Sequence, residues 1–186
     1  MNKELLRKEM RTLRDSFSDE YTEDCSRKIT AAFIESDIYK LSDTVMIYLS
    51  IGSEVRTDAL LKKIFDDGKV CAVPVVKEGE IKISRLHKDS LLIRSAFGIP
   101  EPELPEYCGT GDVDTIVVPA IAYDARGYRI GYGGGYYDRL LNRIGTATTL
   151  VGFCYDKLIV DNINYQPHDK RVDIIISEKG IEVCDE

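Results

Sequence analysis

The sequence has little of what several large classes of protein require. Basic residues are in the minority, with 25 Lys and Arg against 32 Asp and Glu and a net charge of −7, whereas a nucleic-acid-binding domain normally carries a basic surface. The five cysteines are scattered singly, with no C-x-x-C pair, which argues against a disulfide scaffold or a zinc site and favours reduced thiols. No apolar run approaches the ~18 residues that a membrane span needs. The composition therefore predicts neither nucleic acid nor a membrane as a partner.

The amino-terminal residues are charged and lack the apolar segment of a secretory signal, so we expect a cytoplasmic protein. With 186 residues the chain is long enough to bury a sizeable core. We expect one domain over residues 1–186 and a monomer.

Helical and strand patterns alternate along most of the chain. Apolar spacing predicts helices over 2–17, 18–35, 57–67 and 136–144, and strands over 44–50, 70–76, 113–119, 148–154 and 171–177. This order predicts an α/β fold of three layers (α/β/α), with a mainly parallel sheet and helices on both faces. Ligands of such sheets bind beyond the carboxyl ends of the strands.

Three segments fit this pattern less simply. Pro74 interrupts a predicted strand, which we therefore expect to end or bulge there. Residues 80–86 alternate in hydrophobicity, as in an exposed edge strand or a hairpin arm. Residues 97–111 are rich in proline and glycine and predict a long ordered loop or a cover over a cleft.

The first predicted helix has a basic border. Its apolar stripe is predicted to hold Leu6, Met10, Leu13 and Phe17. Lys3, Arg7 and Arg14 lie along one edge of that stripe. They form either a solvated face or, for Lys3 and Arg7, a pair that points into a cleft, and the spacing does not decide between the two.

A glycine loop at 131–135 is the most distinctive segment, with four glycines in five residues. Glycine lets backbone N–H groups come close to a ligand, and a helix start directly after such a loop suits a phosphate. The spacing matches neither a Walker A motif nor the dinucleotide fingerprint. Arg129, Arg139 and the tyrosines at 132, 136 and 137 flank the loop. We interpret it as a nucleotide phosphate site; the alternative is a glycine-rich surface turn.

Three carboxylates are candidate site residues, and two of them, Asp138 and Glu54, have two interpretations each. Asp138 lies in the first turn of a helix, where a negative charge is favourable, or it is a ligand of Mg²⁺, which takes one or two carboxylates together with phosphate oxygens. Asp169 is a candidate second ligand, whereas the neighbouring His168 is predicted to be a surface or hydrogen-bonding residue. Glu54 is either a solvated loop residue or a buried carboxylate that orients an amide or amine of a substrate.

The segment 117–139, which contains the glycine loop, closely resembles the signature of the 5-formyltetrahydrofolate cyclo-ligase (methenyltetrahydrofolate synthetase) family. The resemblance extends over nearly the whole chain, to Lys3, Arg7, 48–57, 98–102 and 168–173. Lys157 departs from it, because many members have glutamine there.

The resemblance implies an activity and a fold. The reaction would be the ATP-dependent conversion of 5-formyltetrahydrofolate to 5,10-methenyltetrahydrofolate, with release of ADP and phosphate. The formyl oxygen would attack the γ-phosphate of ATP, and N10 would then close the ring as phosphate leaves. The implied fold is the one shared with sugar-phosphate isomerases and CoA transferases.

The resemblance also assigns site residues. ATP would be bound by Lys3, Arg7, Arg129, Ile130, Gly131, Tyr132, Gly133, Gly134, Gly135, Tyr136 and Tyr137. The folate would contact Leu49, Glu54, Tyr132, Gly133, Gly134, Gly135 and Tyr136. Arg129 and Tyr136 would be catalytic, and Asp138 and Asp169 would hold Mg²⁺.

Two other functions remain open at this point. A sugar-phosphate isomerase or acyl-CoA transferase of the same fold would turn over its substrate without ATP. A non-catalytic folate- or nucleotide-binding regulator would bind both ligands without releasing ADP.

Overall fold

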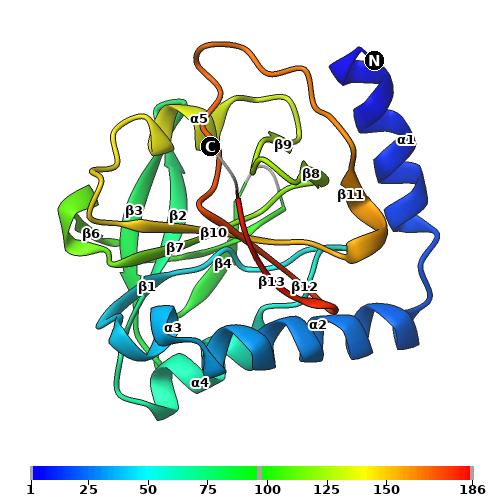
Figure 1. The fold of residues 1–186 in the computed structure, drawn as a ribbon. Helices are drawn as coiled ribbons and strands as arrows, with labels where there is room; N and C mark the ends of the chain where they lie inside the picture. Colours follow the sequence, from blue (N-terminus) through cyan, green and yellow to red (C-terminus); the bar gives the residue numbers. More distant parts are fainter. Residues whose placement is uncertain (1, 96–97, 185–186) are drawn as a thin grey trace.

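The structure, a computed structural model, describes residues 2–95 and 98–184. Among these residues, eight strands form one sheet in the order β13-β12-β10-β7-β1-β2-β3-β6 (Figure 1). The central strands β12, β10, β7, β1 and β2 run parallel, while β13 at one edge and the β3–β6 pair at the other are antiparallel. The predicted mixed α/β class with a mainly parallel sheet is confirmed.

The main sheet comprises β1 (Thr44–Met46), β2 (Val70–Lys77), β3 (Glu80–Leu86), β6 (Glu106–Cys108), β7 (Thr115–Val118), β10 (Thr149–Phe153), β12 (Ile174–Ser177) and β13 (Gly180–Val183). A three-stranded sheet contains β8 (Ala122–Asp124), β9 (Arg129–Ile130) and β11 (Ile159–Val160), and a two-stranded one contains β4 (Leu92–Arg94) and β5 (Pro100–Pro102). Each strand predicted in the parallel sheet is present, and most are shorter than predicted. The largest shortening is in β1, which leaves 47–50 as an extended segment leading into the Glu54 turn.

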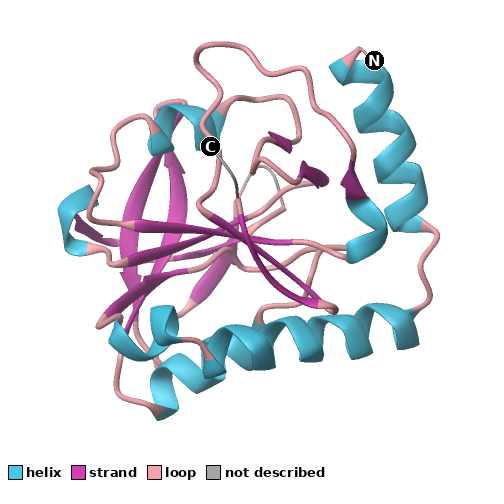
Figure 2. Cartoon of the chain, viewed as in Figure 1, coloured by secondary structure: helices cyan, strands magenta, loops and turns pink. Residues whose placement is uncertain are grey.

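The helices are α1 (Lys3–Asp15), α2 (Asp19–Glu35), α3 (Asp37–Leu41), α4 (Asp58–Asp66) and α5 (Tyr136–Leu141), with 3₁₀ turns at Thr110–Asp112 and Asp156–Leu158. Helices α2, α3 and α4 lie along one face of the sheet, and α5 and the three-stranded sheet lie on the other side (Figures 1 and 2). The Ser18 side chain caps α2 by accepting from the Tyr21 N–H. No helix of the described residues is both long and apolar enough to cross a membrane.

The prediction that the strand ends or bulges at Pro74 is wrong. Pro74 lies inside β2, where it is paired with Ile83 of β3. The register with β1 reaches only Ala72, so the strand has lost its parallel neighbour by the time it reaches the proline. A missing N–H is tolerated where one side of a strand needs no donor.

Two other segments also differ in part from expectation. Residues 80–86 form β3, which is a hairpin arm as one alternative predicted, but β6 covers its far side, so it is not the sheet edge. The predicted 97–111 loop holds the short strands β5 and β6, while Phe97 lies outside the described residues. Neither strand could be predicted from the sequence, because each is only three residues long and the segment around them is rich in proline.

The apolar stripe predicted for α1 is wrong at one position. Leu13 is 37% exposed, whereas its neighbour Arg14 is only 4% exposed. Leu6 is buried as predicted, and Met10 and Phe17 pack partly against the core. A charged side chain is buried in this way only when polar partners receive it.

Gly127 lies in the β8–β9 turn, and its carbonyl accepts a hydrogen bond from the Val172 N–H in the segment that precedes β12. Its φ is +86°, and an added Cβ would lie 2.4 Å from the Val172 carbonyl oxygen. Since both the backbone conformation and the space exclude a side chain, Gly127→Ala should lower the free energy of unfolding by about 2–3 kcal/mol, measured by denaturant titration. Gly145→Ala, where a Cβ meets nothing within 4 Å, is the matched control. Equal stability of the two variants would contradict this account.

Candidate active site

Two loops that follow strands meet at one side of the molecule. The Glu54 turn comes after β1, and the glycine loop comes after β9. The Tyr132 hydroxyl of the glycine loop hydrogen-bonds to the Glu54 carboxylate, although 78 residues separate them. The carboxyl-end location expected for a ligand site therefore brings together residues from distant parts of the chain.

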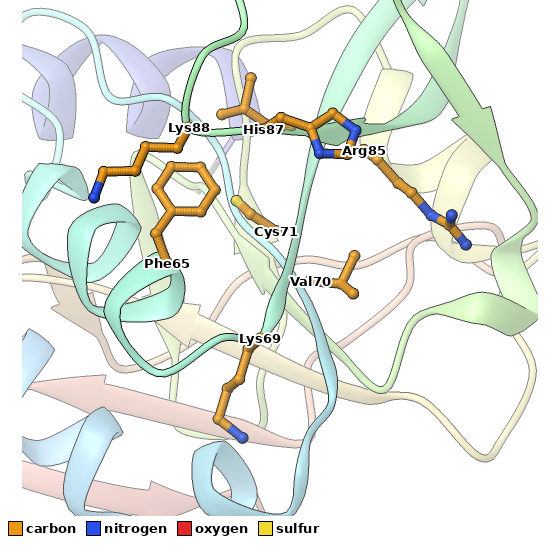
Figure 3. Close-up of a pocket in the computed structure, with 8 residues that line it drawn as sticks. Phe65, Lys69, Val70, Cys71, Arg85, His87 and Lys88 are labelled. Carbon is orange, nitrogen blue, oxygen red and sulfur yellow. The ribbon is translucent and has the colours of Figure 1, made fainter.

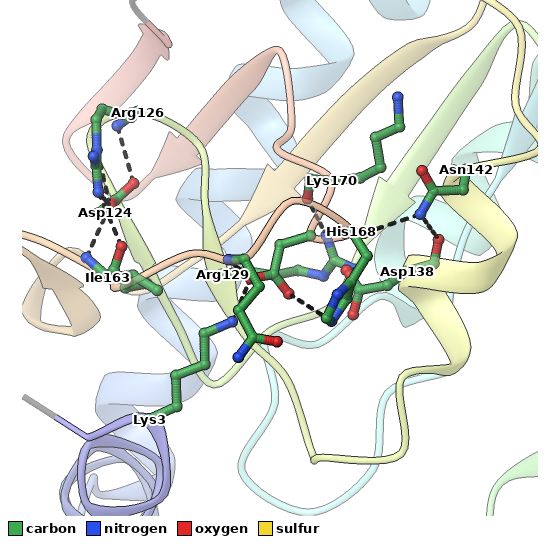
Figure 4. A network of polar contacts seen from close by, with 11 residues as sticks. Lys3, Asp124, Arg126, Arg129, Asp138, Asn142, Ile163, His168 and Lys170 are labelled. Carbon is green, nitrogen blue, oxygen red and sulfur yellow. Dashed lines mark hydrogen bonds and ion pairs between the residues drawn. The ribbon is translucent and has the colours of Figure 1, made fainter.

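Arg129 is the charged centre of this region (Figure 4). Its side chain is only 4% exposed and forms an ion pair with Asp138, with 2.6 Å between Nη2 and Oδ1. Its other terminal nitrogen, Nη1, donates to the Lys170 carbonyl at 2.6 Å. Asn142, which directly follows α5, links the same two segments by donating to the His168 carbonyl at 3.0 Å. A single guanidinium thus joins β9, α5 and the 168–170 segment.

Lys3 and Asp169 form a second ion pair. Asp169 directly precedes Lys170, whose carbonyl accepts from Arg129. Asp169 also accepts from the Gln166 N–H at 2.6 Å. Burial raises the pKa of the Asp169 carboxyl, but Lys3 and the Gln166 N–H outweigh burial and hold this pKa below its ordinary value. Asp169 is therefore an anion at neutral pH.

Arg7 reaches the glycine loop from α1. Its Nε donates to the Gly131 carbonyl at 2.7 Å, and its guanidinium carbon would lie 3.5 Å from a Cβ at Gly133. Within the basic border, Arg7 therefore contacts the glycine loop, whereas Lys3 contacts Asp169. Both side chains have polar partners, unlike those of a freely solvated face. The loop itself requires glycine at Gly134, where a Cβ would come within 2.7 Å of the Tyr136 ring.

Tyr136 and its neighbours form the far side of the loop. The Arg139 guanidinium lies over the Tyr136 ring, 4.8 Å from its centre, and donates to the Gly134 carbonyl at 3.1 Å. The Tyr137 hydroxyl is buried and has no hydrogen-bond partner among the described residues. Burial, with the Glu54 charge nearby, raises the pKa of Tyr137, so its phenol stays protonated.

Glu54 is buried, at 7% exposure, which favours the second of its two readings. One of its oxygens accepts from the Tyr132 hydroxyl and the other from the Ile51 N–H at 2.9 Å. Sequence reasoning did not place Arg14 in this site, yet Arg14 donates to the Tyr132 hydroxyl at 2.8 Å. Its position on the basic border of α1, beside Lys3 and Arg7, was the available signal.

The remaining predicted residues are placed less directly. Leu49 is half-buried after β1, close to the Glu54 turn, and the Ile130 side chain lies in the core, so that only its backbone faces the loop. Lys157, which departs from the family pattern, places its ammonium 4.4 Å from the centre of the Tyr21 ring. That contact lies near the amino end of α2, and no residue of the glycine loop takes part in it.

A separate hollow of about 210 Å³ lies at the amino end of β2 (Figure 3). It is lined by Phe65, Lys69, Val70, Cys71, Arg85, Leu86, His87 and Lys88. The parallel strands β1 and β2 begin there, so the hollow is at the amino ends of the strands, whereas the site around Glu54 follows the carboxyl end of β1. Arg85 and His87 are already engaged by Glu106. The hollow does not belong to the site around Arg129.

The candidate metal ligands near the glycine loop are two carboxylates, Asp138 and Asp169. No group of three or more His, Cys, Asp or Glu side chains that could hold a metal occurs among the described residues. Two carboxylates suffice for Mg²⁺, which keeps water and substrate phosphate oxygens as its other ligands. Asp138 and Asp169 fit that requirement in their chemistry, and each is now neutralised by a cationic side chain.

Known proteins resemble this chain in sequence and in fold. Residues 1–178 match the model of the 5-formyltetrahydrofolate cyclo-ligase family. A 5-formyltetrahydrofolate cyclo-ligase of Mycolicibacterium smegmatis is 30% identical, with 73% of this chain and 74% of the relative aligned, and that of Mus musculus is 28% identical over 81% and 80%. The NMR structure of Aquifex aeolicus 5,10-methenyltetrahydrofolate synthetase is 33% identical and superposes with a TM-score of 0.90, covering 100% of this chain and 94% of that one.

Proposed function

The chain belongs to the 5-formyltetrahydrofolate cyclo-ligase family, and from this premise we propose how its site carries out the ATP-dependent cyclisation of 5-formyltetrahydrofolate to 5,10-methenyltetrahydrofolate. The observation that carries the proposal is the buried Arg129 beside the glycine loop, paired with Asp138. Family membership favours this enzyme over the isomerase, the transferase and the non-catalytic regulator.

The chemical problem is a poor leaving group. The formyl oxygen of an N-formyl group does not depart readily, so it attacks the γ-phosphorus of ATP, and its new O–P bond forms as the bond to ADP breaks. N10 then attacks the activated carbon and loses its proton, and the former formyl oxygen leaves as part of phosphate. Catalysis of phosphoryl transfer relies mainly on positioning and on neutralising charge.

The residues of this chain supply both functions. Arg129, Lys3 and Arg7 bring three cationic side chains to the glycine loop and its surroundings. Helix α5 has only six residues, so its aligned peptide dipoles contribute less than a long helix would, and the cationic side chains bear more of the phosphate charge. Glu54 and Tyr132 lie at the end of the site where we place the folate, with Leu49 beside them.

Tyr136 is the second proposed catalytic residue. Its ring packs against Gly134 and is held beneath the Arg139 guanidinium. This position puts an aromatic face next to the loop that we assign to the phosphates. We propose that Tyr136 contacts both substrates where the phosphoryl group passes between them.

We propose Asp138 and Asp169 as the residues that hold Mg²⁺ with the bound nucleotide. The ion would neutralise phosphate charge and orient the transferring group. Arg129 and Lys3, which now neutralise these carboxylates, would then be available to phosphate oxygens. Asp169 contributes a carboxylate that is charged at neutral pH, and its lowered pKa keeps it charged to a lower pH than an ordinary aspartate.

An optical assay for the methenyl product tests the proposed function. The protein is incubated with 5-formyltetrahydrofolate in the presence and absence of ATP and Mg²⁺, and ADP is measured in parallel. The proposal expects product only with ATP, and one ADP for each product. Product without ATP, or binding of both substrates without ADP release, would refute it.

Arg7→Met should raise the KM for ATP about tenfold and leave the KM for the folate within about twofold. The reason is that Arg7 faces the loop assigned to the phosphates. Arg11→Met is the matched control, because Arg11 lies one turn further along α1 with 60% of its side chain exposed. An equal rise in both KM values would return Lys3 and Arg7 to the solvated-face interpretation.

We further propose that the chain is one domain over 1–186, monomeric and cytoplasmic, with the fold shared by sugar-phosphate isomerases and CoA transferases. One cluster of buried apolar side chains among residues 2–95 and 98–184, drawn from both ends of the chain, supports the single domain. The parallel sheet supports the fold assignment. Sedimentation equilibrium, with a monomer mass of 21.0 kDa, would test the oligomeric state.

A further inference from the structure

Arg14 is a buried cation, and a contribution to folding stability does not account for its burial. It is 4% exposed and donates to Ser53 Oγ at 3.1 Å, to the Ala120 carbonyl at 3.3 Å and to Tyr132 Oη at 2.8 Å. In 2–95 and 98–184 its side chain forms no ion pair with a carboxylate, and burying a charge without a directly paired counter-ion is costly.

Two hydroxyl groups connect Arg14 to carboxylates: Ser53 leads to the exposed Asp15, and Tyr132 leads to the buried Glu54. The Tyr132 hydroxyl accepts from Arg14 and donates to Glu54 Oε1. Burial and the Glu54 charge raise the pKa of Tyr132, although Arg14 opposes them, so the phenol keeps the proton that it donates. The direction of the chain of hydrogen bonds is therefore defined, from Arg14 through Tyr132 to Glu54.

The same end of α1 also holds the Glu54 turn. Ser53, which receives Arg14, donates in turn to the Asp15 carboxylate. The second oxygen of Glu54 is held by the Ile51 N–H at 2.9 Å. Each oxygen of Glu54 thus has one fixed donor, and its remaining lone pairs are left to accept N–H groups from a ligand.

We propose that Arg14 is a positioning residue for the folate: it fixes the Tyr132 phenol and, through it, orients the Glu54 carboxylate towards N–H donors of the folate ring system. The inference rests on the proposed function, which puts Glu54 and Tyr132 at the folate end of the site. Arg14 itself acts through Tyr132 and reaches neither substrate. Lys3 and Arg7 on the same helix serve the nucleotide end, so α1 supports both ends.

A double-mutant cycle on binding tests this role. Calorimetric titration of 5-formyltetrahydrofolate should show about tenfold weaker binding for Arg14→Met and a similar loss for Tyr132→Phe. The double variant should be no weaker than Tyr132→Phe alone, because both changes break one chain of contacts. Binding of ATP by Arg14→Met should stay within about twofold of that by the unmodified protein, as should both affinities of the Arg11→Met control. Arg14→Lys, which keeps the charge but lacks the planar fork, should restore part of the loss.

The outcomes separate this inference from the proposed function. Additive losses in the double variant, or equal weakening of ATP and folate binding, would overturn the role of Arg14 while leaving an active enzyme. If Arg14→Met does not fold by circular dichroism, Tyr132→Phe decides: the half-exposed Tyr132 ring can lose its hydroxyl without a cavity, and unchanged folate binding would overturn the proposal. An unmodified protein that fails to bind the folate would refute both.

Discussion

Replacing Arg129 by methionine should lower kcat on the order of 10²–10³-fold, since one preorganised donor to a developing charge is worth about that much. Arg129 is the most buried of the cations that we assign to the phosphates, and it is already oriented by two hydrogen bonds of 2.6 Å, to Asp138 and to the Lys170 carbonyl. Methionine retains most of the side-chain volume and removes only the charge and the donors. Steady-state rates of methenyl formation measure the effect.

Two controls make the Arg129 result specific. Arg11→Met removes an exposed arginine of α1 and should leave kcat unchanged. Circular dichroism of Arg129→Met should match that of the unmodified protein, because Asn142 still links the end of α5 to the 168–170 segment. A loss of kcat below about threefold in a folded Arg129→Met protein would remove Arg129 from the catalytic assignment.

Asp138→Asn should reduce kcat about 100-fold, for two physical reasons. The amide cannot supply the negative charge that Mg²⁺ requires of its ligand, and it leaves the buried Arg129 guanidinium without its ion-pair partner. If the first reason dominates, saturation should need a higher Mg²⁺ concentration, and raising Mg²⁺ should restore part of the rate. Initial rates over a Mg²⁺ titration distinguish this from a simple loss of Arg129 orientation.

Asp24→Asn is the matched control for Asp138→Asn. Asp24 also lies on a helix and is paired with Arg27 and Lys28, but it is exposed on α2, away from the glycine loop. It should leave both kcat and the Mg²⁺ response unchanged. A folded Asp138→Asn protein with the unmodified Mg²⁺ response and near-normal kcat would exclude Asp138 as a metal ligand.

Most of the fold followed from periodic patterns. The parallel strands and the helices α1, α2 and α4 appear close to the predicted positions, because their apolar faces repeat with helical or strand spacing over several residues. The errors lie where tertiary context decides. Pro74 is accepted in β2 since the pairing with β1 has already ended, and no local pattern shows where a neighbouring strand stops.

The exchange between Leu13 and Arg14 has the same cause. Helical spacing predicts the leucine inside, but the partners of Arg14 come from Ser53, Ala120 and Tyr132. These residues lie 39 to 118 positions away in the sequence. Only the folded chain shows that a polar pocket receives the arginine, so its burial could not be derived from the pattern of α1.

The candidate members of the site come from the sequence, and the contacts between them come from the structure. Arg129, Asp138, Lys3 and Asp169 were all candidates, with the cations assigned to phosphates and the carboxylates to Mg²⁺. That they pair with one another, as Arg129 with Asp138 and Lys3 with Asp169, needed the structure. The pairing changes the interpretation, because a substrate and its metal ion would replace existing ion pairs in a site that is already neutralised.

The most direct test of the central claim follows the formyl oxygen. 5-Formyltetrahydrofolate labelled with ¹⁸O in its formyl group is converted with unlabelled ATP and Mg²⁺ in ordinary water, and the released phosphate is examined by mass spectrometry. Attack of the formyl oxygen on the γ-phosphorus predicts one ¹⁸O atom in each phosphate released. Unlabelled phosphate alongside full formation of the methenyl product would contradict the mechanism.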